Sequence, residues 1–222
     1  MTVQKEKPMN ELPVMLEGEG IMLFYPHIPK KAIDAVTEVL SGRWIGQGPR
    51  VAQFEKEFGE RFGGGSKALA VGSGTDALHL AYILAGLNEG DEVITPVFTC
   101  TATTIPFLYM GVHFRFADVD PETLNINVEH VRKLVNEKTK AIVCVHYGGL
   151  PCDMDELLAI GREFGIPVIE DAAHAVEAGP FGEFAREDEP EPFRVRSGNA
   201  GRIEGGLSHV DPGQVGGGSG ES

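Results

Sequence analysis

Short apolar runs alternate with helix-length amphipathic segments between residues 67 and 171. The runs are rich in Val, Ile and Phe and apolar almost throughout, which is typical of strands buried on both faces of a parallel sheet. Strands joined by helices in this way predict an α/β fold with a parallel sheet and right-handed crossovers. The expected strands are residues 67–71, 92–96, 113–118, 140–146 and 167–171.

Helices are expected between these strands and before them. The best marked candidate is 153–164, because Asp153 can cap its first turn and Gly165 can end it. Two amphipathic segments precede the alternating block, and a loop at 42–49 separates them. The expected helices are residues 29–40, 51–62, 75–85, 101–110, 128–135 and 153–164.

The composition changes towards both ends of the chain. Residues 1–21 are polar, and we expect a flexible leader there, followed by one folded domain at 22–178. Residues 179–222 are rich in Gly, Pro, Glu and Arg, and 193–196 is their only strand-like fragment. Such a segment buries too little apolar surface to offset its ordering entropy, so we expect this tail to be disordered.

Charge and cysteine content exclude several classes of function. A net charge of −14 repels nucleic acid and anionic membranes, so neither is expected as a partner. The N-terminus has no apolar signal core, and no stretch reaches the length of a membrane span, which favours a cytoplasmic location. Cys100, Cys144 and Cys152 lack zinc-ligand spacing, so we expect small buried apolar residues and no metal site.

Polar residues follow several of the predicted strands, at the sheet edge where α/β proteins bind ligands. The turn Gly72-Ser73-Gly74-Thr75 opens a helix, and its N–H groups can hold a phosphate, although a plain strand–helix turn has the same pattern. Asp171 ends the last strand, where a carboxylate can pair with a protonated pyridine nitrogen or simply cap a helix. His146, in a glycine-bearing turn, is interpreted as structural rather than catalytic.

Together these stretches resemble the DegT/DnrJ/EryC1/StrS aminotransferases, which are fold type I pyridoxal-phosphate enzymes acting on nucleotide-linked sugars. The similarity covers about residues 22–178. The fold it implies is α/β, with the three-layer parallel sheet of the fold type I large domain, incomplete at its C-terminal strands. The matching stretches are Trp44-Ile45-Gly46-Gln47-Gly48-Pro49, Gly72-Ser73-Gly74-Thr75-Asp76-Ala77-Leu78, Thr95-Pro96-Val97-Phe98-Thr99, His146-Tyr147-Gly148-Gly149 and Glu170-Asp171-Ala172-Ala173-His174-Ala175.

The resemblance implies roles for matching positions in binding pyridoxal 5'-phosphate. Gly74 and Thr75 would contact the phosphate, Asp171 the pyridine nitrogen, and His174 the region of the ring hydroxyl. Cys100 occupies a position where the family often has an aromatic residue stacked on the ring, so another residue must supply that contact. The implied substrates are a nucleotide-linked keto sugar and an amino-acid donor, glutamate in the first place, and a homodimer is possible.

One element of the family pattern is missing, since no lysine follows Lys140. The family's cofactor-binding lysine would lie downstream of Asp171, so no catalytic residue is assigned. A few relatives use histidine instead, but the surroundings of His209 match no such motif. We therefore expect a truncated or frame-shifted, inactive aminotransferase, with an open sheet edge where strands are missing. The alternatives are a catalytically dead module that binds cofactor or sugar nucleotide, and a non-functional fragment.

Overall fold

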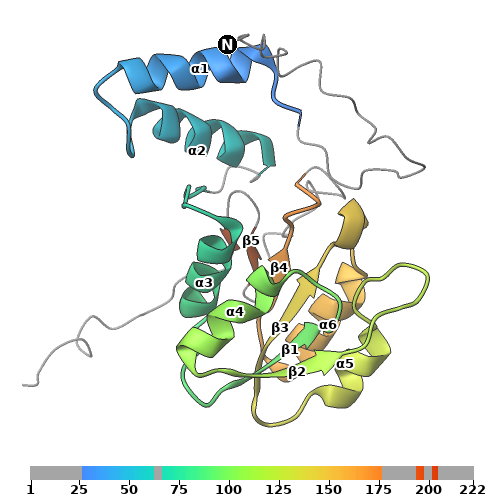
Figure 1. Ribbon diagram of the computed structural model, residues 1–222. Helices are drawn as coiled ribbons and strands as arrows, with labels where there is room; N and C mark the ends of the chain where they lie inside the picture. Colours follow the sequence, from blue (N-terminus) through green and yellow to red (C-terminus); the bar gives the residue numbers. More distant parts are fainter. Residues whose placement is uncertain (1–26, 63–66, 177–193, 198–201, 205–222) are drawn as a thin grey trace, which may run out of the picture. The chain divides into compact units, whose positions relative to one another are not determined.

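The computed structural model describes residues 27–62, 67–176, 194–197 and 202–204 (Figure 1). The chain divides into two compact units, Met1–Gly48 and Pro49–Ser222. The predicted leader at 1–21 lies outside the described residues, as does most of the predicted tail. Among the described helices, none combines the length and the apolar character that crossing a bilayer requires.

The first unit contributes one described helix, α1 (Lys30–Ser41), which matches the helix expected at 29–40. The second unit begins with α2 (Pro49–Phe62), on which the rings of Phe54, Phe58 and Phe62 follow one another with centroids 5.6 and 4.9 Å apart. This spacing of four residues is the helical repeat that the sequence pattern indicated.

The centre of the second unit is a parallel sheet in the order β2-β1-β3-β4. Helix α3 precedes the first strand, and α4, α5 and α6 form the crossovers in chain order. The strands are β1 (Glu92–Pro96), β2 (His113–Ala117), β3 (Thr139–Val145) and β4 (Val168–Asp171). The helices are α3 (Gly74–Leu84), α4 (Thr101–Met110), α5 (Val128–Leu134) and α6 (Met154–Phe164).

Two apolar cores, one on each face of the sheet, make three layers. Alternate strand residues such as Val93 and Val143 pack with α3 and α4, whereas Ile94 and Ile142 pack with α5 and α6. Because successive side chains of a strand point to opposite faces, near-continuous apolar runs fill both cores. The predicted three-layer α/β fold is confirmed.

Local signals explain why the helices begin and end where they do. The Asp153 carboxylate accepts the N–H of Glu156 at 3.4 Å and caps α6, and Gly165 ends that helix with φ at 65°. Gly111 ends α4 in the same way, with φ at 67°. Glycine adopts this left-handed conformation without steric cost, so both stops were predictable.

The segment 67–71 is not one of the described strands, contrary to our expectation. Leu69 is 52% exposed, and the N–H of Ala70 donates to the Glu55 carboxylate at 2.9 Å. An isolated apolar run becomes a strand only when a neighbour pairs with its backbone groups, and the sequence pattern cannot show whether that neighbour is present.

Seven residues of the predicted disordered tail form strands. β5 (Arg194–Ser197) pairs in parallel with β4, and β6 (Arg202–Glu204) pairs in antiparallel with β5. Without a neighbour, β4 would leave backbone N–H and C=O groups unpaired, and an extended segment can pair with them. This is the physical reason why part of the tail forms strands where we expected disorder. Residues 193, 198–201 and 205–222 lie outside the described part of the chain.

The packing of α6 against the sheet predicts a large effect of truncating a side chain there. Ile160 is fully buried, so Ile160→Ala should lower the free energy of unfolding by about 2–5 kcal/mol through lost contacts and a cavity. Ile83, on α3, is 51% exposed, so Ile83→Ala should change the free energy of unfolding by less than about 0.5 kcal/mol. Urea unfolding of both variants measures the difference, and equal losses would contradict the described packing.

Candidate functional site

The carboxylate of Asp171 lies buried at the carboxyl end of β4, where its side chain is only 5% exposed. The hydroxyl of Thr103 donates to its Oδ2 at 2.8 Å, and the N–H of Ala173 donates to its Oδ1 at 3.2 Å. Both oxygens are therefore oriented by the protein. The chain continues into a turn closed by Ala175 N–H to Ala172 O, and no helix follows within residues 172–176, so Asp171 is not a helix cap.

Thr103 belongs to a chain of hydroxyl groups that reaches Asp171 from helix α4. Its Oγ1 lies 2.7 Å from that of Thr99, and because Thr103 donates to Asp171, Thr99 is the donor in this contact. Tyr82, on α3, donates its hydroxyl to the carbonyl of Thr103 at 2.9 Å. Sequence reasoning missed both Thr103 and Tyr82, and the four-residue spacing of Thr99 and Thr103 was the only available signal.

Tyr82 stays protonated in this environment. Burial raises the pKa of its hydroxyl well above the usual value, and the nearby Asp171 and Cys144 raise it further. A neutral hydroxyl can act as the donor that the Thr103 carbonyl requires. Tyr82 therefore fixes α3 against the first turn of α4, next to the carboxylate.

Gly74 and Thr75 form the first turn of α3, as predicted. The Ser73 side chain accepts the N–H of Asp76 at 3.1 Å and caps the helix. Among the described residues, no atom lies within 4 Å of the position that a Cβ on Gly74 would occupy, so a bulky group can approach the backbone on that side. Free N–H groups and the helix dipole make such a turn suited to an anionic oxygen. Two described hydrogen bonds connect α3 with Asp171, through Tyr82 and Thr103.

His174 lies on an exposed turn after β4, beside two aromatic rings. Its Nδ1 accepts the N–H of Gly148 at 3.3 Å, and its ring meets Tyr147 edge-on with centroids 5.7 Å apart. Tyr147 in turn packs against Phe98 at 4.5 Å. Phe98 is 42% exposed and lies two residues before Cys100, so this edge of the sheet has an aromatic surface even though position 100 is not aromatic.

His146 is almost completely buried, at 1% exposure, between Glu170 and Cys152. Its Nε2 lies 2.8 Å from Glu170, and its Nδ1 accepts the N–H of Cys152 at 3.1 Å. Because the Cys152 N–H opposes a second proton at Nδ1, we assign the imidazole proton to Nε2, facing Glu170.

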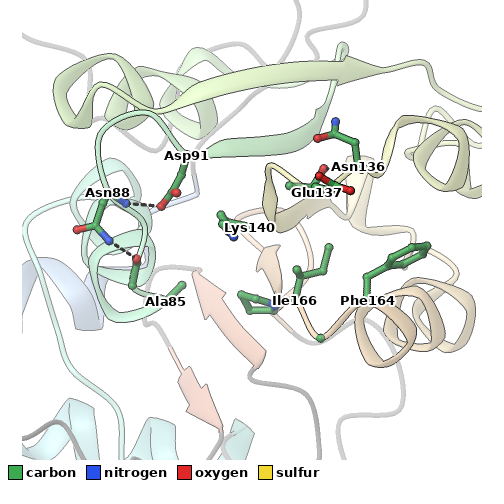
Figure 2. A pocket seen from close by; sticks show the side chains of 12 residues that line it. Ala85, Asn88, Asp91, Asn136, Glu137, Lys140, Phe164 and Ile166 are labelled. Carbon is green, nitrogen blue, oxygen red and sulfur yellow. Dashed lines mark hydrogen bonds between the residues drawn. The ribbon is translucent and has the colours of Figure 1, made fainter.

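A cavity of about 710 Å³ opens at the opposite edge of the sheet, near the amino ends of β1, β3 and β4. Its lining comes from the loops before these strands, the start of β3 and the end of α6. Figure 2 shows Lys140 among the lining residues, with Asn88 hydrogen-bonded to Asp91 on one side. None of the predicted site residues lines it. Since open α/β sheets bind ligands at the carboxyl ends of their strands, the residues around Asp171 remain the candidate site.

Comparison with known proteins shows the family of the chain. Residues 26–185 match the DegT/DnrJ/EryC1/StrS aminotransferase family. The chain belongs to this family. The spore coat polysaccharide biosynthesis protein SpsC of Bacillus subtilis is 47% identical over 151 residues, which are 68% of this chain and 39% of SpsC. The chain therefore spans about two-fifths of the length of that family member.

Solved structures of aminotransferases show the same fold. The aminotransferase TlmJ of Streptoalloteichus hindustanus superposes with a TM-score of 0.66 at 37% identity, over 71% of this chain and 43% of TlmJ. The NtdA protein of Bacillus subtilis, solved with bound PMP, superposes with a TM-score of 0.65 at 31% identity, over 77% of this chain and 40% of NtdA. Both likenesses place this chain in the PLP aminotransferase fold, as the sequence motifs predicted.

The turn beside His174 predicts different effects of two neighbouring substitutions. Gly148 and Gly149 both have positive φ, 61° and 89°, so alanine is strained at either position. A Cβ at 149 would also lie 3.1 Å from the His174 carbonyl, whereas one at 148 would meet no atom of the described part of the chain within 4 Å. Gly149→Ala should therefore cost about 1 kcal/mol more than Gly148→Ala and shift the NMR signals of the His174 ring. Equal effects on stability and on that ring would contradict the close approach.

Proposed function

We propose that this chain forms the cofactor-binding part of a PLP-dependent aminotransferase of the sugar-nucleotide type. The reaction is transfer of an amino group from an amino acid, in the first place glutamate, to a keto sugar carried on a nucleotide. Family membership supports the reaction class. The observation that carries the proposal is the Asp171 carboxylate, buried at the ligand-binding edge with both oxygens oriented by hydrogen bonds.

The residues at this edge suit pyridoxal 5'-phosphate, which supplies an electron sink for chemistry at the amino-acid carbon when it is bound. Asp171 offers a carboxylate to the ring nitrogen. Gly74 and Thr75 offer backbone N–H groups and a hydroxyl to the phosphate, and the space beside Gly74 leaves room for it. The family resemblance assigns His174 to the region of the ring hydroxyl, and Phe98 is a candidate for the aromatic contact that Cys100 cannot make.

Each residue has a task that follows from its contacts. Thr103 and Ala173 hold the carboxylate so that its charge favours a proton on the ring nitrogen. Tyr82 keeps Thr103 in place from the neighbouring helix. The Gly148 N–H orients the His174 ring through its hydrogen bond to Nδ1.

The 222 residues contain no lysine after Lys140, which limits the cofactor chemistry that we propose for them. No amine is available downstream of Asp171 to hold the cofactor covalently or to move a proton at the substrate carbon. We therefore propose that the chain alone takes up the cofactor without covalent attachment and does not turn over. The same observation supports the second candidate function, a binding module for cofactor or sugar nucleotide.

Replacing Asp171 tests the proposal directly. Asp171→Asn keeps the shape but removes the charge, and a hydrogen bond to a charged group contributes about 1.5–3 kcal/mol, so affinity for pyridoxal phosphate should fall about 10- to 100-fold. Asp155→Asn, on the exposed first turn of α6, is the matched control and should bind like the unaltered chain. Equilibrium dialysis measures all three proteins.

Two results would count against the proposal. Equal affinity of the Asp171→Asn protein and the control would exclude Asp171 as the partner of the ring nitrogen. A borohydride-reducible adduct mapped to one lysine of this chain would show covalent attachment and overturn the proposed non-covalent mode.

A further inference from the structure

Three metal-ligating side chains lie together on the face of the sheet opposite Asp171. Cys144 is in β3, His146 follows that strand, and Cys152 precedes α6. One potential ligand atom from each lies within 4.8 Å of the other two. The three residues are 0%, 1% and 5% exposed, and the proposed aminotransferase function uses none of them.

The imidazole of His146 is oriented as in many metal sites. Glu170, itself fully buried, holds Nε2 at 2.8 Å, which leaves the lone pair of Nδ1 on the side of Cys152. Histidine ligands usually donate their second N–H to a carboxylate in this way, which fixes the tautomer and increases the basicity of the ligating nitrogen. The N–H of Cys152 occupies that lone pair in the described structure.

The two sulfurs belong to a soft donor environment. The Cys152 thiol donates to the Val145 carbonyl at 3.2 Å, and Cys144 Sγ lies 3.7 Å from the thioether of Met154. Each thiol loses its proton when its sulfur binds a metal ion, so both cysteines can serve as thiolate ligands.

We propose that Cys144, His146 and Cys152 bind a divalent thiophilic metal ion, Zn²⁺ being the ordinary cellular example. Binding releases two thiol protons, and the resulting thiolates balance the charge of the ion in the protein interior. The hydrogen bond from Cys152 N–H to Nδ1 is given up, and the metal–ligand bonds replace it. Glu170 keeps its partner at Nε2, so no charge is left buried without a partner.

Cobalt is the probe for the wild-type protein because Co²⁺ bound to thiolates has intense sulfur-to-metal charge-transfer bands and tetrahedral d–d bands. The full 222-residue chain, with its cysteines reduced, should show both on titration, saturating at about one ion per chain. Zn²⁺ should abolish the bands by displacement and raise the midpoint of thermal unfolding, because it binds the folded state. Folded protein that shows no charge-transfer band at saturating Co²⁺ would overturn the proposal without the need for any variant.

Serine variants locate the site. Cys152→Ser and Cys144→Ser should each weaken Co²⁺ affinity at least about tenfold and reduce the charge-transfer intensity. Cys100→Ser is the matched control, since Cys100 is exposed and lies outside the cluster, and it should bind like the wild type. Unchanged bands in a folded Cys144→Ser/Cys152→Ser protein, or their loss in Cys100→Ser, would contradict the assignment. Circular dichroism establishes that each variant is folded.

Discussion

The hydrogen bond between Thr103 and Asp171 is the contact on which the rest of the candidate site depends. A carboxylate at the end of a buried strand is stable only if donors replace the water it has lost. Thr103 supplies one such donor from α4, and Tyr82 connects α3 to the same residue. This one network therefore fixes two helices and a strand end at the candidate site.

The alternation of side chains along β4 separates two kinds of chemistry. Glu170 and Asp171 are adjacent and both buried, but Glu170 meets His146 on the α6 side, whereas Asp171 meets Thr103 on the α4 side. The two carboxylates therefore have different hydrogen-bond partners, and the strand holds them on opposite faces of the sheet. The Cys144, His146 and Cys152 cluster follows in part from the same alternation, since Cys144 lies in β3 and His146, two residues on, lies just after the strand.

Much of the fold was predictable from local patterns, and the site only in part. The bounds of β1 and α4 agree with the sequence-based ranges because apolar periodicity and Gly111 define them locally. The position of Asp171 followed from its place at the end of an apolar run. Thr103 and the cysteine–histidine cluster were missed, because they arise from side chains that only the crossovers bring together. The error at 67–71 has the same origin, since strand pairing is a long-range property that residue patterns do not contain.

A double-mutant cycle on the free energy of unfolding tests the central contact most directly, and it requires no ligand. Thr103→Val and Asp171→Asn are measured singly and together by urea denaturation, with Thr104→Val in place of Thr103→Val as the control cycle. If the described hydrogen bond holds α4 to the end of β4, the first pair should couple by about 1–3 kcal/mol and the control pair by less than about 0.5 kcal/mol. Additive effects of Thr103→Val and Asp171→Asn would contradict the account.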